Sequence, residues 1–219
     1  MKRAIRGRKT SVPALPALPV ISPSSRIPRI ARHRPHCPFS GLARNALYSA
    51  RPVQNGGENV ELVSVRIDKP EGLNIVIGQS HFIKTAEDVY EAVVNAVPQA
   101  KFGVAFCEAS TKCLVRVEGN DEEMKKIAAK NALALSAGHT FFIALKDAYP
   151  VNILRAINNV PEVCHIICAT ANEVDVIVAQ NGRGRGIMGV IDGEKSKGLE
   201  TDADVSERRA FLRKIGYKR

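Results

Sequence analysis

The sequence contains no tryptophan, and aromatic residues make up only 5% of it. No apolar run approaches the ~18 residues that a membrane-spanning helix needs, so we expect no membrane partner. Five cysteines among 219 residues are too few for a disulfide scaffold. They predict reduced core thiols in a cytoplasmic protein. No P-loop pattern occurs, so any phosphoryl chemistry has to use another scaffold.

Acidic residues are missing from the first 57 residues, which hold 11 of the 32 lysines and arginines and 8 of the 12 prolines. The rest of the chain therefore holds 21 basic and 22 acidic residues, although the whole chain has a formal net charge of +10. A globular nucleic-acid binder carries its positive charge on the folded part. The distribution of charge therefore argues against a nucleic-acid partner.

Residues 1–59 are predicted to be a disordered basic leader, because proline breaks periodic structure. Two explanations remain open: an organelle transit peptide, or upstream sequence translated from a misplaced start. We favour the second, because residues 56–58 can be encoded by a purine-rich run and Val60 by a GTG start codon. His33, His36 and Cys37 fall in this leader and are given no role.

Residues 60–219 are predicted to form one compact mixed α/β (α+β) domain, with a mixed sheet of about seven or eight strands covered by about four helices. Alternation and apolar runs predict strands at Glu61–Asp68, Leu73–Ile77, Phe102–Cys107, Lys112–Val117, Phe141–Leu145, Val163–Cys168, Val174–Ala179 and Ile187–Ile191. Helical spacing and end signals predict helices from Thr85 to Pro98, from Asn120 or Asp121 to Gly138, after Pro150, and over Ala203–Ile215. Val151, Leu154 and Ile157 form the expected inner face of the third helix.

Polar clusters at strand ends are the places where α/β sheets put ligands. In the first cluster, Gly78 is expected to turn the chain, and Gln79, Ser80, His81 and Lys84 follow it before a helix N-terminus, which favours anions. A histidine with a pKa near ~6.5 is often neutral at physiological pH. His81 is therefore a candidate general base or phosphoryl-accepting nucleophile; the alternative is a structural histidine.

Four further clusters contain candidate binding residues: Glu108 and Ser110, His139, Asn172, and the loop with Gly184, Arg185 and Gly186. Each has a plainer alternative, in which the Glu108 cluster is a solvated turn and His139 bonds to helix carbonyls. The Asn172 cluster would then be a turn of small residues, and the glycine loop a flexible hairpin. The G-x-G-x-x-G spacing of Gly184, Gly186 and Gly189 is not a dinucleotide site, because a strand is predicted where that motif needs a helix.

A metal site is not predicted. Cys164 and Cys168, with His165 nearby, lie in an apolar strand, whereas structural zinc uses paired C-x₂₋₄-C spacings from loops. The cysteines of the domain, Cys107, Cys113, Cys164 and Cys168, are instead expected to lie in strands as small core residues.

Several stretches taken together are typical of one family. They are Gly78–Lys84 (GQSHFIK), Lys101–Ser110 (KFGVAFCEAS), Gly138–Thr140 (GHT), Asn159–Cys164 (NVPEVC), Cys168–Asn172 (CATAN), Gly184–Gly193 (GRGIMGVIDG) and Phe211–Tyr217 (FLRKIGY). From Val60 to Lys218 the chain resembles the adenosine-specific kinases. The resemblance implies binding of adenosine or AMP, phosphoryl transfer involving a histidine, and a homo-oligomer. His81 is the first choice for that histidine and His139 the second, whereas His165 departs from the family pattern and is excluded.

The sequence thus predicts an adenosine- or AMP-binding phosphotransferase. Its expected donor is ATP or another adenine nucleotide, with Mg²⁺ held by Asp192 or Glu108. The predicted catalytic residues are His81, Lys84 and Arg185, and the predicted nucleotide-binding residues are Gln79, Ser80, Glu108, Ser110, His139, Asn172, Gly184 and Gly186. The alternatives are a non-catalytic adenosine nucleotide sensor and an RNA-associated protein that uses its basic leader. The expected compartment is the cytoplasm, or an organelle if the leader is a transit peptide.

Overall fold

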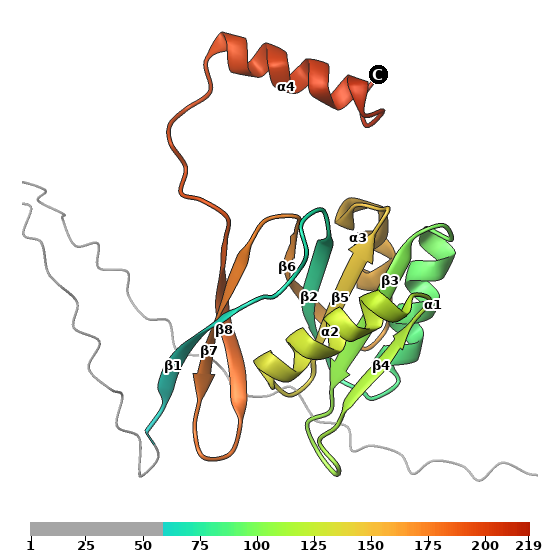
Figure 1. Cartoon of the computed structure of the whole chain (residues 1–219), viewed down its shortest axis with the longest axis vertical. Coiled ribbons are helices and arrows are strands. Elements are labelled where there is room, and N and C mark those ends of the chain that lie inside the picture. The colour runs from blue at the N-terminus through green and yellow to red at the C-terminus, as the bar shows by residue number, and fades with distance from the viewer. Residues whose placement is uncertain (1–58) are drawn as a thin grey trace, which may run out of the picture. The chain divides into compact units, whose positions relative to one another are not determined.

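Eight strands and four helices follow one another along residues 59–219, the part of the chain that the computed structural model describes (Figure 1). This number of elements confirms the mixed α/β domain expected from the apolar periodicity. The prediction of a disordered leader falls almost wholly on residues 1–58, outside the described residues. No helix within residues 59–219 combines the length and the apolar character needed to cross a membrane.

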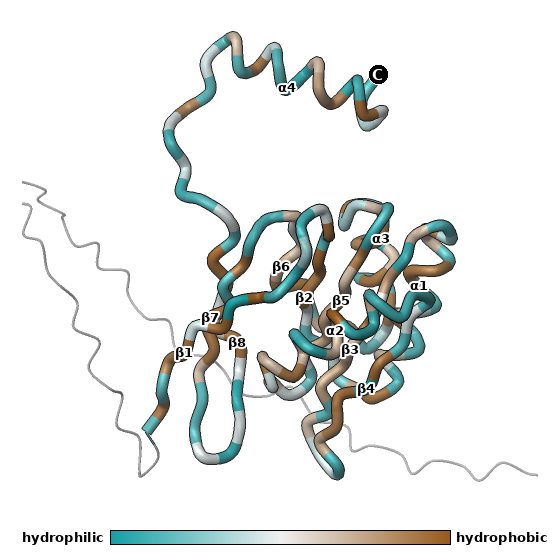
Figure 2. The backbone as a smooth tube through the Cα atoms, in the orientation of Figure 1, coloured by the Kyte–Doolittle hydropathy of each residue, from teal (hydrophilic) through white to brown (hydrophobic). Residues whose placement is uncertain are grey.

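The larger sheet has five strands in the order β4-β3-β5-β2-β6. The central strand β5 and its neighbours β2 and β3 are almost entirely buried, because their sequences are nearly continuous apolar runs. In Figure 2, hydrophobic colour is prominent along the strands of this sheet. The five strands are β2 (Asn74–Ser80), β3 (Lys101–Cys107), β4 (Val115–Gly119), β5 (Thr140–Lys146) and β6 (Val163–Thr170).

Helices cover both faces of this sheet, and the alternation of large and small residues in β3 shows why. Its large residues Phe102, Val104 and Phe106 belong to the core under α1 (Thr85–Ala96) and α3 (Pro150–Asn158). Its small residues face α2 (Glu122–Leu135). A Cβ on Gly103 would lie 2.4 Å from the backbone of Met124. The missing side chain therefore lets α2 lie directly on the strand.

A second, three-stranded sheet lies on the same face as α2. Its order is β1-β7-β8, formed by β1 (Glu61–Arg66), β7 (Val174–Gln180) and β8 (Arg185–Asp192). Val174, Val176 and Val178 of β7 join the core that contains Ile75 and Ile77 of β2. The single mixed sheet of the sequence prediction is thus two sheets, and every strand pairing within residues 59–219 is antiparallel. The chain folds over the larger sheet after β6, because β7 buries its alternate valines there.

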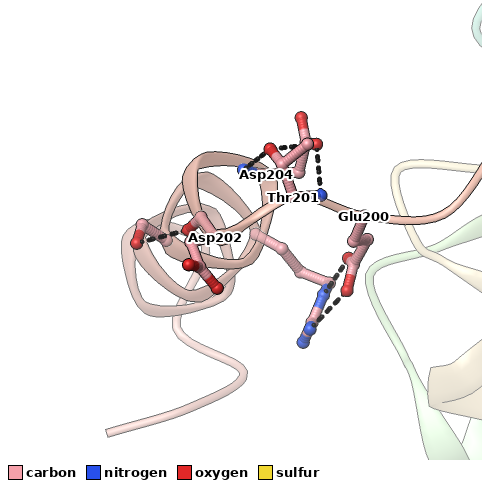
Figure 3. A network of polar contacts seen from close by, with 6 residues as sticks. Glu200, Thr201, Asp202 and Asp204 are labelled. Atoms are coloured by element: carbon pink, nitrogen blue, oxygen red, sulfur yellow. Dashed lines mark hydrogen bonds and ion pairs between the residues drawn. The ribbon is translucent and has the colours of Figure 1, made fainter.

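The last helix, α4 (Asp202–Lys214), agrees with the predicted helix over Ala203–Ile215 but buries none of its residues. Its start is held by a reciprocal capping box between Thr201 and Asp204, and Glu200 accepts two hydrogen bonds from Arg208, at 2.6 and 2.9 Å (Figure 3). After the helix, the Tyr217 hydroxyl lies 3.4 Å from Asn152 Oδ1.

Local predictions failed where glycine was taken as a turn signal. Strand β2 does not end before Gly78 but continues to Ser80. A Cβ on Gly78 would lie 2.3 Å from Phe141 Cζ and 2.8 Å from the carbonyl oxygen of His165. Gly78 is therefore required by packing inside the sheet. Similarly, α2 ends at Leu135, and the left-handed residue that follows it is Ser136, with a φ of +47°, and not Gly138.

Three other boundaries differ from the sequence prediction. Thr85 is the first helical residue of α1 rather than its cap, and its hydroxyl donates to the carbonyl oxygen of Phe82. The inner face of α3 contains Ile153 and Ile157, whereas Val151 is 62% exposed. Strand β4 begins at Val115 rather than Lys112, because Thr111 and Cys113 adopt positive φ and form a turn.

Candidate functional site

Four of the five predicted clusters meet at one end of the five-stranded sheet. At this end β2 and β3 finish while β5 and β6 begin, because neighbouring strands run in opposite directions. The segment after Gln79, the loop with Glu108 and Ser110, and the turn with His139 are therefore neighbours. The turn between β7 and β8 brings Arg185 to the same end.

Backbone hydrogen bonds tie two of these segments to the turn that holds His139. The His139 N–H donates to the carbonyl oxygen of Cys107 at 2.8 Å, and the Ser80 N–H donates to that of His139 at 2.9 Å. His139 has a φ of +63°, and its half-buried ring stacks on Phe106 with centroids 6.1 Å apart. Residues other than glycine rarely adopt this left-handed conformation, and those that do cluster at functional sites.

His81 and Lys84 lie on the exposed bend between β2 and α1. The Lys84 ammonium is paired with Asp88 and lies 3.1 Å from Glu162 Oε2. The hydrogen bond to Asp88, with a weaker one to Glu162, raises the pKa of Lys84, and Lys84 in turn lowers the pKa of Asp88. Lys84 would therefore have to leave a carboxylate to contact a phosphate.

Two other predicted residues have structural contacts. Ser80 is 2% exposed, and its hydroxyl shares a 2.7 Å hydrogen bond with that of Thr85. Glu108 accepts hydrogen bonds from the Leu114 N–H at 3.2 Å and from Arg116 Nη2 at 3.0 Å. The Leu114 N–H is the main cause that lowers the pKa of Glu108. Glu108 thus holds the turn between β3 and β4, and Ser110 is exposed in that turn.

A pocket of about 300 Å³ lies at this end of the sheet, between β2, the turn before β5, β6 and β8. At its edge the Arg185 guanidinium donates from Nη1 to the Ala134 carbonyl oxygen at 3.1 Å and from Nε to Gln180 Oε1 at 2.9 Å. The guanidinium is thus fixed against the end of α2. The pocket is lined by Gln79, Ala137, Gly138, Thr140, His165, Ile167, Arg185, Gly186, Ile187, Met188 and Gly189.

Comparison with known proteins agrees with the motifs. Residues 65–218 match the family described as adenosine specific kinase. The chain belongs to this family. The crystal structure of the PH1918 protein from Pyrococcus horikoshii OT3 is similar: its sequence is 45% identical, the TM-score is 0.70, and the match covers 73% of this chain and 99% of that one. No curated protein matches the chain. Membership of the adenosine-specific kinases supports an adenosine-related, kinase-like function.

Asn172 lies at the end of the sheet opposite to the pocket, because Asn172 follows the last residue of β6, whereas the pocket adjoins the first residues of that strand. Its side-chain amide donates to Asp192 Oδ1 at 3.0 Å, and the Thr170 hydroxyl donates to the same oxygen at 2.9 Å. The structure therefore does not bring Asn172 and Asp192 together with the other predicted residues.

Residues of the predicted glycine loop line two hollows. Gly186 and Arg185 line the 300 Å³ pocket, and together with Gly184 they also line a neighbouring hollow of about 470 Å³ beside Val60. The loop continues directly into β8. Rejection of the dinucleotide motif is confirmed, because a strand stands where that motif needs a helix.

The prediction that all four domain cysteines are core residues is wrong for two of them. Cys107 and Cys168 are buried, and burial raises the pKa of each thiol to about 11. Cys113 and Cys164 are exposed, because Cys113 lies in a turn and Cys164 on an outward position of the edge strand β6. Within residues 59–219, no group of three or more His, Cys, Asp or Glu side chains is placed to hold a metal ion.

Sequence reasoning missed two polar residues that line the pocket. Thr140 and His165 both line it, although Thr140 was given no role and His165 was excluded. In the sequence, the only sign of a role for His165 was that a polar residue interrupts the apolar run Val163–Cys168. That signal became informative only once the strand register placed His165 opposite Gln79.

Proposed function

We propose that the protein is an adenosine- or AMP-directed phosphotransferase, whose nucleoside lies in the 300 Å³ pocket. One observation carries this proposal: in a chain of the adenosine-specific kinase family, Gln79, Arg185 and the turn that holds His139 surround or adjoin a single pocket. The volume is at the lower end of ligand pockets, which suits a nucleoside better than a dinucleotide.

The phosphoryl group is proposed to pass through a histidine, and His81 is the first candidate. His81 is two residues beyond Gln79, so about 7 Å of extended chain separates it from the pocket lining. A neutral imidazole nitrogen attacks the terminal phosphorus of ATP or another adenine nucleotide. The bond from that phosphorus to the bridging oxygen breaks, the nucleoside diphosphate leaves with the electron pair, and the ring releases a proton to solvent. A hydroxyl acceptor then takes the phosphoryl group.

His139 is the second candidate for the same step, and its strained backbone supports it. Arg185 and the backbone amide of Gly186 would neutralise charge on the phosphate, since positioning and electrostatics dominate phosphoryl transfer. The Gly184 amide would join them only after leaving Asn181 Oδ1, to which it donates at 3.1 Å. Lys84 would contribute only after leaving its carboxylate partners.

Magnesium is proposed only as a counter-ion of the nucleotide. Mg²⁺ is commonly bound by one or two carboxylates together with substrate phosphates. Glu108, the candidate carboxylate at this end, is already paired with Arg116, and Asp192 lies at the other end of the sheet. The described residues therefore do not fit a dedicated Mg²⁺ site, and no step is assigned to the ion.

Labelling with radioactive ATP tests the histidine step. We expect the full chain to incorporate acid-labile phosphate, the His81→Asn variant to lose it, and the matched His33→Asn variant, at a histidine given no role, to keep it. Removing one charge-stabilising contact typically lowers kcat by 10²–10³-fold, so loss of the nucleophile itself should be near complete. If the His81→Asn variant is labelled as strongly as the unaltered protein and the His139→Asn variant is not labelled, His139 is the histidine that accepts the phosphoryl group. If no variant is labelled while AMP binds saturably, the protein is a non-catalytic sensor.

A homo-oligomer is also proposed. Large apolar side chains are exposed on the edge strands β1 and β8 and on α4, and they would form an interaction surface where they join into a continuous apolar patch. They include Leu62 (63% exposed), Met188 (68%), Ile191 (55%) and Phe211 (55%). A sedimentation mass equal to that of one chain would reject this part of the proposal.

A further inference from the structure

Three polar residues that line the pocket form a row across three adjacent strands. In the strand register, Gln79 of β2 pairs with Thr140 of β5 on one side and with His165 of β6 on the other. Residues directly opposite each other in antiparallel strands project to the same face, with Cβ atoms about 4.5–5.5 Å apart. Thr140, Gln79 and His165 therefore lie side by side.

This row interrupts an apolar face. Two residues back along β2, Ile77 pairs with Phe142 and Cys168, and all three residues are buried in the core. The register of β6 shifts between Ile77 and Gly78, so Cys168 lies three residues beyond His165 along β6. The polar row begins where that core ends, and all three of its members line the pocket. Gln79 and His165 are exposed. Among the hydrogen bonds and ion pairs of residues 59–219, none engages the side chain of either residue, so both are available to a ligand.

The chemistry of a carboxamide points to the ligand group that this row binds. A glutamine amide offers one acceptor and a donor side by side. Adenine presents the complementary pair on its N1 edge, where the N6 amino donor stands next to the N1 acceptor. Asn and Gln pair in the same bidentate way with N6 and N7 of adenine. Met188, Ile187 and Ile167 add apolar surface beside the row. Such surface suits the face of a purine ring.

We infer that Gln79 reads the amino-bearing edge of adenine in this pocket, and that His165, beside it, is a second specificity-determining residue. This inference rests on the proposed function, because it assigns the base-binding part of the same pocket. His165 pairs with Gln79 in the strand register, so its ring would limit how the base can approach. The row thereby selects 6-aminopurines over 6-oxopurines.

A change of base preference tests the inference more sharply than a loss of binding. In the Gln79→Glu variant, the carboxylate only accepts hydrogen bonds, so it repels the ring-nitrogen acceptor of adenine but can accept from the N1–H of hypoxanthine. We expect adenosine affinity, measured by calorimetry with the full chain, to fall about tenfold or more. The ratio of inosine to adenosine affinity should rise. The His165→Ala variant should also lower the ratio of adenosine affinity to inosine affinity.

Controls separate the possible failures. Cys164→Ser changes the exposed neighbour of His165 that does not line the pocket, and it should leave both affinities within twofold. Thermal unfolding of each variant shows whether it is folded, and the Gln79→Asn variant provides a shorter amide if Gln79→Glu does not fold. If the unaltered protein binds neither adenosine nor AMP, the proposed function and this inference both fail. If it binds adenosine but Gln79→Glu and His165→Ala keep the original selectivity, the base-reading role alone is wrong.

Discussion

Gly78 shows that a residue's role can differ from the one its type suggests. The sequence predicted a turn, whereas the structure places Gly78 inside β2 with no room for a side chain. We expect Gly78→Ala to lower the free energy of unfolding by about 1–3 kcal/mol, because the backbone carbonyl of His165 cannot move aside as a side chain could.

Urea denaturation measures this effect, and Gly182→Ala is the matched control. A Cβ on Gly182 meets nothing within 4 Å, so its substitution should change stability by no more than about 0.5 kcal/mol. Equal stability of the two variants would mean that the close contacts of Gly78 relax without cost.

Asp88 gives a pH-dependent prediction at the same scale. Its pKa in the folded protein is lowered, mainly by the hydrogen bond from Lys84. A carboxylate of this kind stabilises the fold above its ordinary pKa of about 3.9, and the contribution is lost as the pH falls through the lowered value. The stability difference between the unaltered protein and Asp88→Asn should therefore be constant from about pH 7 to pH 5 and shrink below about pH 4.

The neighbouring Glu87 provides the control for this pH profile. It lies in the same first turn of α1 but is exposed, so Glu87→Gln should have a smaller effect at every pH. A difference between the unaltered protein and Asp88→Asn that grew toward acid pH would have the wrong sign and reject the assigned ion pair. Chemical denaturation at a series of pH values provides the measurement.

At the scale of elements, the start of α2 was read from the sequence as Asn120 or Asp121, and Asp121 is its N-cap. Asp121 caps it by accepting from the Glu123 and Met124 N–H groups at 3.0 and 3.1 Å. We expect Asp121→Ala to cost about 1 kcal/mol of stability, the usual value for a lost N-cap. Asp121→Asn should cost much less, because asparagine caps equally well. Urea denaturation that gave equal losses for both variants would show that the cap contributes nothing.

The elements themselves were largely predictable, because helices and strands depend on local periodicity. The apolar run Phe141–Leu145 predicted a strand buried on both faces, and β5 is such a strand. The errors lie at places where a distant element decides the outcome. In α3, Ile153 is buried and Val151 is exposed. The spacing of apolar residues within the helix did not show which of its faces would pack on the sheet.

At the scale of the whole molecule, the antiparallel order of the larger sheet creates the candidate site. Gln79, His139 and Arg185 are far apart in the chain, yet the direction of each strand brings their turns to one end. The same topology sends Asn172 to the other end. The sequence presented five clusters, of which the one with His81 was preferred and the one with Asn172 was weak as a pattern, but nothing in their spacing showed which of them meet in space.

The sequence alone determined the type of nearly every element, the family and the set of polar clusters worth considering, because these depend on patterns within short stretches of chain. Tertiary structure alone decided that the domain has two sheets, that Gly78 is needed for packing, and that His165 stands beside Gln79. These facts depend on strand order and register between distant segments. Such pairing is fixed by the burial of whole faces against each other, and no short stretch of chain contains that information.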